Sequence, residues 1–290
     1  MIYGALEAGG TKMVCATGTK DGKILDQITL PTLKPEDTIP GIIDYFKDKN
    51  IAALGIASFG PVDLNPDSPT YGHITTTPKP GWADYDIVGA FKKALNIPIG
   101  FDTDVNGSLL GEVTFGDSKG LSDVIYITIG TGVGGGIMAG GKLLHGMLHP
   151  ELGHMLLRSH PSDPYPGRCP FHRNCLEGMA AGPAIEDRWG AKGKDLASND
   201  AVWELEAYYI GQAMVNLILT LSPKRIILGG GVMHKKQLFK LIREETKKQL
   251  GGYIDTPLLH DMDGYIVPAS LNDDQGILGC IKLAADVLKE

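Results

Sequence analysis

Four side chains between residues 154 and 175 have the types and spacing of metal ligands. Cys169, His172 and Cys175 lie on a short irregular segment, and His154 precedes them in the chain. Two thiolates and two imidazoles make a tetrahedral ligand set that suits zinc, and four protein ligands leave no position for water. The pattern therefore predicts a structural Zn²⁺ site. A free cysteine pair and a redox couple are the alternative interpretations.

Two glycine-rich turns, about half a chain apart, have the composition of phosphate-binding loops. Residues 3–16 and 124–141 each contain a short apolar run, a turn of small residues and a second β-prone run. Small residues leave backbone N–H groups free to point at an anion. An ordinary hairpin with glycines at bulges is the alternative for one such turn, but the repetition favours a duplicated architecture. The candidate phosphate-binding residues are Gly9, Gly10, Thr11, Lys12, Thr131 and Gly132.

The apolar pattern predicts the elements that must position these motifs. Helices are expected at 36–50, 87–95, 106–114, 200–221, 237–250 and 273–288, and further strands at 52–58, 97–101, 225–228 and 265–268. Gly60 and Pro61 follow the strand at 52–58, and ligands of open α/β sheets lie at such carboxyl ends. Asp102 and Asp104 follow the strand at 97–101. Acids at the end of a strand can have a functional role, or they can cap the helix that follows. For Asp102, capping alone is a sufficient role.

Composition and charge restrict the class of protein. The chain has 290 residues, of which 43% are hydrophobic, enough for one large or two ordinary domains. Its net charge is −7 and its Lys and Arg residues are dispersed, so no nucleic-acid partner is expected. Because no apolar run could span a bilayer and no signal-like segment opens the chain, we expect a cytoplasmic protein without a membrane partner. The four cysteines do not form a disulfide framework, and Cys15 and Cys280 are expected in core elements.

Five motifs resemble those of the ROK family of repressors and sugar kinases, in order and spacing. They are EAGGTK at 7–12, DTDVNG at 102–107, IGTGVGGG at 129–136, ELGH at 151–154 and LGGGV at 228–232. SFGPVDL at 58–64 and TTTPKPGW at 75–82 resemble the fructokinase branch more narrowly. The resemblance covers essentially the whole chain. It implies an actin-like ATPase (ribonuclease H-like) α/β fold whose two domains flank a nucleotide and sugar cleft. The expected domains are residues 1–116 plus 275–290, and residues 117–274.

The resemblance also implies roles for individual residues. Asp104 would be the catalytic base that takes a proton from a sugar hydroxyl. The expected sugar-binding residues are Gly60, Pro61, Trp82, Asn106, Glu151, His154 and Glu177. For Trp82, a ring stacked on the sugar and packing beneath its loop are equally compatible with the sequence. ATP, as its Mg²⁺ complex, would bind along the two turns and at Pro183, Gly229, Gly230 and Gly231, although a tight strand-to-helix turn also explains the three glycines.

The chain departs from the family pattern at two positions. Glu7 stands where the family usually has Asp, and the extra methylene moves a carboxylate associated with the metal–nucleotide complex. Phe171 stands where the family more often has a cysteine, so His172 must replace that zinc ligand. His154 would then contact both zinc and sugar through its two ring nitrogens.

The resemblance implies ATP-dependent phosphorylation of a hexose primary hydroxyl, most simply D-fructose to fructose 6-phosphate, by a homodimer. Glucose, mannose and N-acetylmannosamine are the alternative substrates. A sugar-responsive repressor fits badly, because the first turn begins at Glu7 and leaves no room ahead of it for a DNA-binding module. A nonenzymatic sugar-responsive regulator is a further alternative, against which Asp104 and both glycine turns argue.

Overall fold

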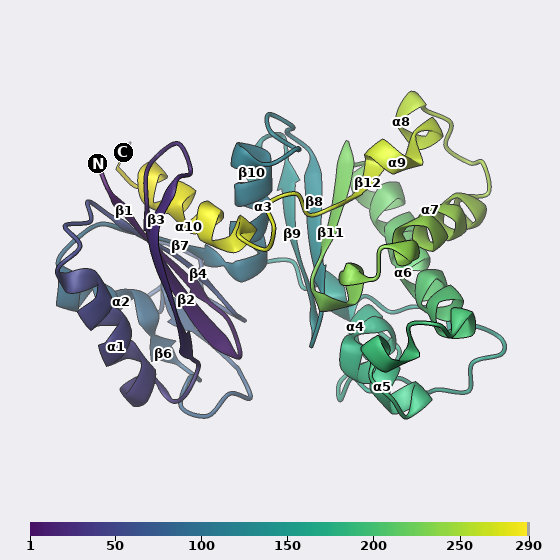
Figure 1. Ribbon diagram of the computed structural model, residues 1–290, viewed down its shortest axis with the longest axis horizontal. Helices are drawn as coiled ribbons and strands as arrows, with labels where there is room; N and C mark the ends of the chain where they lie inside the picture. Colours follow the sequence, from purple (N-terminus) through teal and green to yellow (C-terminus); the bar gives the residue numbers. More distant parts are fainter. Residues whose placement is uncertain (289–290) are drawn as a thin grey trace. The chain divides into compact units, whose positions relative to one another are not determined.

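Two five-stranded sheets with the same topology organise the structure (Figure 1). In the first, the strand order is β3-β2-β1-β4-β7: β1 (Tyr3–Ala8), β2 (Lys12–Gly18), β3 (Ile24–Pro31), β4 (Leu54–Ser58) and β7 (Ile99–Thr103). In the second, it is β10-β9-β8-β11-β12: β8 (Val124–Ile129), β9 (Val133–Ala139), β10 (Lys142–Leu143), β11 (Arg225–Gly229) and β12 (Ile266–Pro268). Each sheet joins an antiparallel hairpin to parallel strands. The predicted duplication is thereby confirmed.

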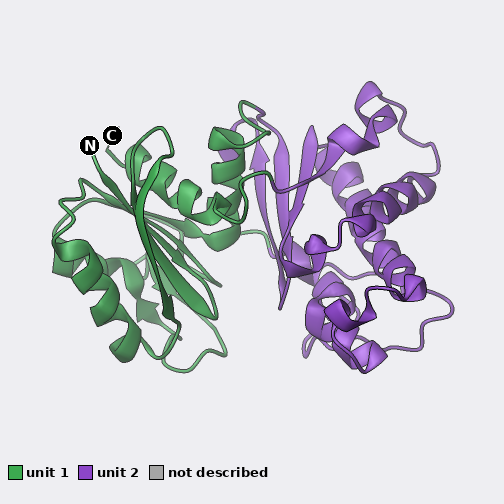
Figure 2. Cartoon of the chain, viewed as in Figure 1, with its two compact units in different colours: residues 1–120, 143–150, 270–290 green, residues 121–142, 151–269 purple. Residues whose placement is uncertain are grey.

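The computed structural model describes residues 1–288, which divide into two units (Figure 2). Unit 1 comprises Met1–Gly120, Leu143–Pro150 and Ser270–Glu290, and unit 2 comprises Leu121–Lys142 and Glu151–Ala269. Lys289 and Glu290, which the predicted first domain includes, lie outside the described residues. The predicted boundaries assigned Leu143–Pro150 to the second domain, whereas in the structure this segment packs with unit 1.

The first sheet separates two hydrophobic cores because successive side chains of a strand point to opposite faces. Leu6 of β1 packs with α1 (Pro35–Lys47) and α2 (Ile87–Leu95) on one face. Ala5, its neighbour, packs with α10 (Gln275–Asp286) on the other (Figure 1). α3 (Asp104–Phe115) lies against α10. Close approach here requires glycine, since a Cβ atom at Gly279 would overlap the carbonyl of Gly107.

Unit 2 has one large core beneath its sheet. It contains side chains of β8, β11 and the two longest helices of this unit, α6 (Asp200–Leu221) and α7 (Gln237–Leu250). α4 (Leu176–Ala180) and α5 (Gly182–Trp189) contribute the apolar residues Leu176, Met179 and Ile185. The remaining short elements are β5 (His73–Ile74) and β6 (Tyr85–Asp86) in unit 1, and η1 (Leu152–His154), η2 (Gly193–Leu196), η3 (Gly231–His234), α8 (Pro257–His260) and α9 (Met262–Tyr265) in unit 2.

Element types agree with the sequence-based expectations, and boundaries shift by a few residues. α3 begins at Asp104 rather than at residue 106, so the acid belongs to the helix. β9 begins at Val133 rather than near Gly136, which shortens the second glycine turn. No helix within residues 1–288 combines the length and the apolar character needed to cross a bilayer.

Candidate functional site

The first glycine turn joins β1 to β2 and exposes its backbone. The N–H of Gly9 donates to the carbonyl of Lys12 at 3.0 Å, which closes the turn. Gly10 has open space where a side chain would lie, and Lys12 is exposed at the end of the turn. Lys79 of the TTTPKPGW loop, which was not predicted to be a site residue, donates from Nζ to the carbonyl of Gly10. Two ammonium groups therefore lie at this turn.

Glu7, near the end of β1, carries a perturbed carboxyl group. Its pKa is raised from 4.5 to about 7, mainly by burial; the neighbouring charges of Asp104, Asp274 and Asp273 contribute to this rise, and Lys12 opposes it. The group therefore holds a proton part of the time near neutral pH. A cation bound beside it would favour the ionised form.

The carboxyl end of β7 continues directly into α3, whose first residue is Asp104. Thr103 caps this helix, since its Oγ1 accepts the N–H of Asn106 at 3.1 Å. Asp102 is buried, and its Oδ1 accepts 2.7 Å hydrogen bonds from the N–H of Thr103 and from Nδ2 of Asn106. The capping role considered for Asp102 is therefore wrong, because Thr103 occupies the capping position.

Two of the predicted sugar-binding side chains are buried. Asn106 is 1% exposed and donates to Asp102, so it holds that carboxylate. Trp82 is 0% exposed; its Nε1 donates to the carbonyl of Leu33 at 2.7 Å and its ring packs against Phe59. In this structure the two side chains expose almost no surface to a sugar, and Oδ1 of Asn106 is buried without a hydrogen-bond partner among the described residues. Of the two roles considered for Trp82, packing beneath its loop is the one observed.

The segment Leu143–Pro150 contacts the carboxyl ends of β4 and β7, which are adjacent parallel strands. Nε2 of His145 lies 2.8 Å from Oδ2 of Asp102. Nε2 of His149 accepts the N–H of Val62 at 3.1 Å, next to the predicted ligand-binding residues Gly60 and Pro61. Neither histidine was predicted from the sequence; the available signal was their spacing of four residues just before ELGH.

In unit 2, the second glycine turn lies next to two other segments predicted to bind nucleotide. The carbonyl of Gly130 accepts the N–H of Gly182 at 2.8 Å, at the start of α5 and beside Pro183. Gly230 has a φ of +88°, and a Cβ atom there would lie 2.5 Å from the carbonyl oxygen of Ile129. The structure thus brings together Thr131, Gly132, Pro183, Gly229, Gly230 and Gly231.

Glu177 connects the second turn to the metal-ligand segment. Its Oε2 accepts the N–H of Val133 at 3.0 Å, and it follows Cys175 by two residues at the start of α4. Glu151 is exposed and its carbonyl accepts the N–H of His154, in the short helix η1. Glu151, His154 and Glu177 therefore belong to unit 2, whereas Gly60, Pro61 and Asp104 belong to unit 1.

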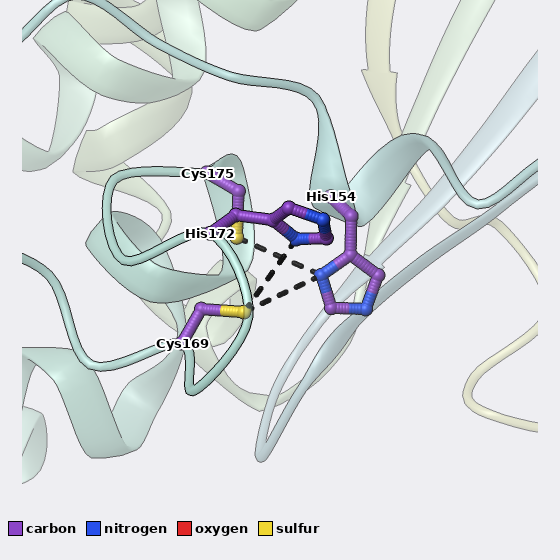
Figure 3. A group of neighbouring side chains, drawn as sticks. All are labelled: His154, Cys169, His172 and Cys175. Atoms are coloured by element: carbon purple, nitrogen blue, oxygen red, sulfur yellow. Dashed lines mark hydrogen bonds between the residues drawn. The ribbon is translucent and has the colours of Figure 1, made fainter.

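The four predicted metal ligands form one cluster (Figure 3). Their ligand atoms all lie within 4.8 Å of one another. Nδ1 of His154 is 3.7 Å from Sγ of Cys169 and 3.6 Å from Sγ of Cys175, and Nδ1 of His172 is 3.8 Å from Sγ of Cys169. Tetrahedral zinc with Zn–S of about 2.3 Å and Zn–N of about 2.0 Å separates N from S by about 3.5 Å. The donor set and its spacing therefore fit zinc, and Nε2 of His154 points away from the sulfurs.

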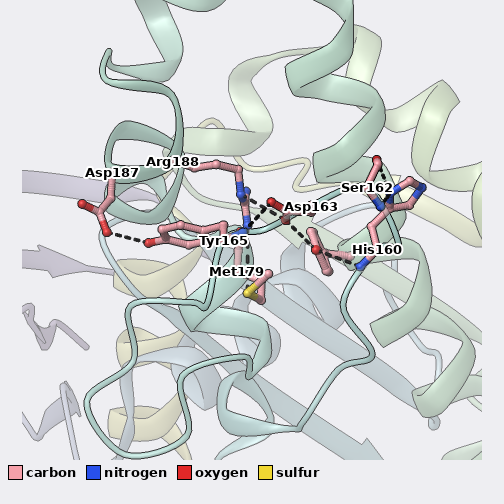
Figure 4. Close-up of polar contacts among 8 residues, drawn as sticks. His160, Ser162, Asp163, Tyr165, Met179, Asp187 and Arg188 are labelled. Atoms are coloured by element: carbon pink, nitrogen blue, oxygen red, sulfur yellow. Dashed lines mark hydrogen bonds and ion pairs between the residues drawn. The ribbon is translucent and has the colours of Figure 1, made fainter.

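A second polar cluster, centred on Arg188, was not anticipated from the sequence (Figure 4). The buried guanidinium places Nε 3.3 Å from Oδ2 of Asp163 and stacks over Tyr165 at 4.5 Å from the ring centroid. Tyr209 of α6 donates to the same carboxylate at 2.6 Å. These contacts fix the loop that leads to Cys169, so we assign the cluster a structural role.

Comparison with known proteins places this geometry in a family. The ROK family model matches residues 3–287. A fructokinase from Pediococcus pentosaceus is 48% identical over 100% of this chain and 99% of its own, and a fructokinase from Lactococcus lactis subsp. cremoris is 44% identical over 98% and 97%. A solved ROK hexokinase from Thermus thermophilus superposes with a TM-score of 0.80 at 25% identity, covering 100% of this chain and 99% of that one. A ROK family glucokinase from Streptomyces griseus, solved with glucose and AMPPNP, gives a TM-score of 0.77 at 23% identity, covering 99% and 100%.

Proposed function

The chain belongs to the ROK family and has its actin-like α/β fold, and we propose that it is an ATP-dependent kinase that converts D-fructose to fructose 6-phosphate. The observation that carries the proposal is the 48% identity to a fructokinase over essentially the full length of both chains. Motifs that resemble the fructokinase branch, at 58–64 and 75–82, support the choice of fructose over other hexoses.

Asp104 is the proposed catalytic base. Its carboxylate accepts the proton of the primary hydroxyl as that oxygen attacks the γ-phosphorus. Position supports this role, because Asp104 is half-buried at the amino-terminal end of α3, at the carboxyl edge of the first sheet. In unit 1, the proposed sugar-binding groups are the backbones of Gly60 and Pro61. In unit 2, they are the side chains of Glu151, His154 and Glu177.

The two glycine turns are the proposed phosphate-binding elements. Gly9, Gly10 and Thr11 offer exposed backbone, and Lys12 neutralises phosphate charge. Thr131 and Gly132 act in the same way in unit 2, where Pro183 and the glycines at 229–231 accept the rest of the nucleotide. Mg²⁺ supplies additional charge neutralisation when it is bound. Glu7 lies close enough to Asp104 for the charge of that carboxylate to raise the pKa of Glu7.

His154, Cys169, His172 and Cys175 would hold a structural Zn²⁺, which supplies rigidity rather than reactivity because four protein ligands fill its coordination sphere. Cys175 and Glu177 lie at the start of α4, so a metal bound to Cys175 would also hold in place the segment that carries the Glu177 carboxylate, which contacts Val133. We further propose that the protein is a homodimer and that it acts in the cytoplasm, where ATP is available.

The decisive test is ATP turnover with Mg²⁺ across fructose, mannose, glucose and N-acetylmannosamine, with kcat/KM measured for each. We expect a clear preference for fructose. Preference for another hexose would support the proposed kinase activity but contradict the proposed specificity for fructose. Absence of turnover on all four sugars, in protein shown to contain zinc, would favour a nonenzymatic sugar-responsive regulator.

A further inference from the structure

The carboxylate of Asp102 is buried at the carboxyl end of β7 and uses both oxygens. Oδ1 accepts from the N–H of Thr103 and from Nδ2 of Asn106, both at 2.7 Å, and Oδ2 lies 2.8 Å from Nε2 of His145. The side chain of Asp102 is 4% exposed, whereas that of His145 is 41% exposed. His145 is thus the partner of one oxygen of a buried carboxylate whose other oxygen is held by the start of α3.

A second contact holds the same segment of chain at the neighbouring strand. His149, four residues after His145, accepts the N–H of Val62 at 3.1 Å in the turn that follows β4. β4 and β7 are paired in parallel, with Ser58 opposite Thr103. The segment Leu143–Pro150 is therefore attached at two points to the edge of the sheet from which Asp104 projects.

We propose that His145 is a positioning residue for phosphoryl transfer, an inference that rests on the proposed kinase activity. It holds Oδ2 of Asp102, and Asp102 in turn fixes Thr103 and Asn106, which flank Asp104 at the start of α3. In this proposal His145 acts on the reaction through Asp102.

Removing the imidazole leaves a buried carboxylate oxygen without its partner, a costly situation that Asp102 relieves by moving toward water. Movement of Asp102 carries with it the Thr103 amide and the Asn106 side chain. Because a displacement of about 1 Å at a reacting group can cost about 100-fold in rate, the effect falls on kcat.

The charge state of His145 belongs to the same pair. The hydrogen bond to Asp102 raises the pKa of His145 above 6.5, its burial opposes the shift, and the charge of Asp102 adds to it. Asp102 is the charged group that contacts His145; Asp104 lies two residues further along the chain, and His149 is on the same segment as His145. Loss of the imidazolium charge weakens the pair, so kcat should decline on the alkaline side of the pKa of His145.

The test compares His145→Ala with His145→Gln, which keeps an N–H donor but does not titrate. His260→Ala is the matched control, because Nε2 of His260 also contacts a carboxylate, Asp255, but at an exposed site in unit 2. Turnover with fructose, KM for both substrates and thermal stability are measured from pH 6 to pH 9. A separate NMR titration of the His145 ring is run in the wild-type protein and in Asp102→Asn.

We expect His145→Ala to lower kcat about 10- to 100-fold with KM for ATP nearly unchanged. His145→Gln should restore kcat to within about threefold and lack the alkaline decline, and His260→Ala should match the wild-type protein. Wild-type kcat in His145→Ala would overturn the proposal, and so would equal losses in both variants that follow thermal stability. If the wild-type chain phosphorylates no sugar, the proposed kinase fails; the NMR titration still decides the pairing, since an unchanged His145 pKa in Asp102→Asn contradicts it.

Discussion

The two glycine turns occupy the same place in sheets of the same topology, yet their surroundings differ. Charged groups surround the turn between β1 and β2: the ammonium of Lys79 contacts Gly10, Lys12 ends the turn, and Glu7 has a pKa near 7. The turn between β8 and β9 is held by backbone, through the N–H of Gly182, and by a single carboxylate, that of Glu177.

The two turns share a backbone arrangement, but the side chains around them differ in chemistry. A hairpin with small residues at its turn exposes N–H groups wherever it occurs. Beside the turn of unit 1 lie Glu7, Lys12 and Lys79, whereas the turn of unit 2 contacts Glu177, which follows the metal-ligand cluster by two residues. We therefore expect substitutions in unit 1 to change the chemical step and its pH dependence, and substitutions in unit 2 to change binding and stability.

The largest effect should come from Asp104→Asn, which removes the proposed base from unit 1 and keeps the size of the side chain. General-base catalysis contributes about 10²- to 10⁴-fold, so kcat should fall by that factor while KM for ATP stays near its wild-type value. Steady-state kinetics with fructose and ATP measure both. Full activity in Asp104→Asn would show that Asp104 is not the catalytic base. It would also contradict the expectation that substitutions in unit 1 change the chemical step.

Metal removal should act on unit 2 mainly through stability. We expect one zinc per chain in native mass spectrometry, and a strong chelator should lower Tm by about 5 °C, on the order of 2 kcal/mol for a chain of this size. Cys175→Ser should reproduce the shift, and Cys15→Ser, at a buried thiol outside the cluster, is the control. An unchanged Tm after verified zinc loss would contradict the structural role.

A matched pair of glycine substitutions compares the turns directly. A Cβ atom at Gly132 would lie 2.8 Å from Oε2 of Glu177, so Gly132→Ala must displace that carboxylate; at Gly10 no atom lies within 4 Å. We expect Gly132→Ala to raise KM for ATP about tenfold, because loss of one hydrogen bond to a charged group costs about 1.5 kcal/mol. Gly10→Ala should fold with wild-type Tm. Equal effects of both substitutions on Tm would show that the turns are packed alike.

The smallest effect concerns Glu7 and pH. Its folded-state pKa of about 7 exceeds the ordinary value of 4.5, so its contribution to stability is fully present below pH 4.5 and is lost as pH rises through 7. Glu7→Gln should therefore raise Tm by a few degrees at pH 8 and much less at pH 5, in Mg²⁺-free buffer. Glu36→Gln, on the exposed side of α1, is the control. A Tm difference that does not depend on pH would refute the raised pKa.

Sequence alone predicted what depends on local pattern. Cys169, His172 and Cys175 are close in the sequence, so their spacing alone indicated a metal-ligand set. The glycine turns were recognisable because each hairpin is continuous in the chain. The burial of these side chains was not predictable, because it depends on tertiary packing. Trp82 donates a hydrogen bond to the carbonyl of Leu33, 49 residues away, and Asn106 donates one to the buried Asp102. The pairing of His145 with Asp102 joins residues 43 positions apart, and the histidine lies in a stretch without helical or strand periodicity.

The placement of α10 has a consequence for how the protein is made. This helix packs against β1, β4 and α3, and the thiol of Cys280 donates to the carbonyl of Leu6, 274 residues earlier. During translation, the amino-terminal sheet therefore leaves the ribosome with one face uncovered and waits for residues 275–286 before that face can be buried. At about 5–20 residues per second the delay lasts on the order of 10 s or more. Unit 2, continuous from Glu151 to Ala269 after a short first segment, can complete its core earlier.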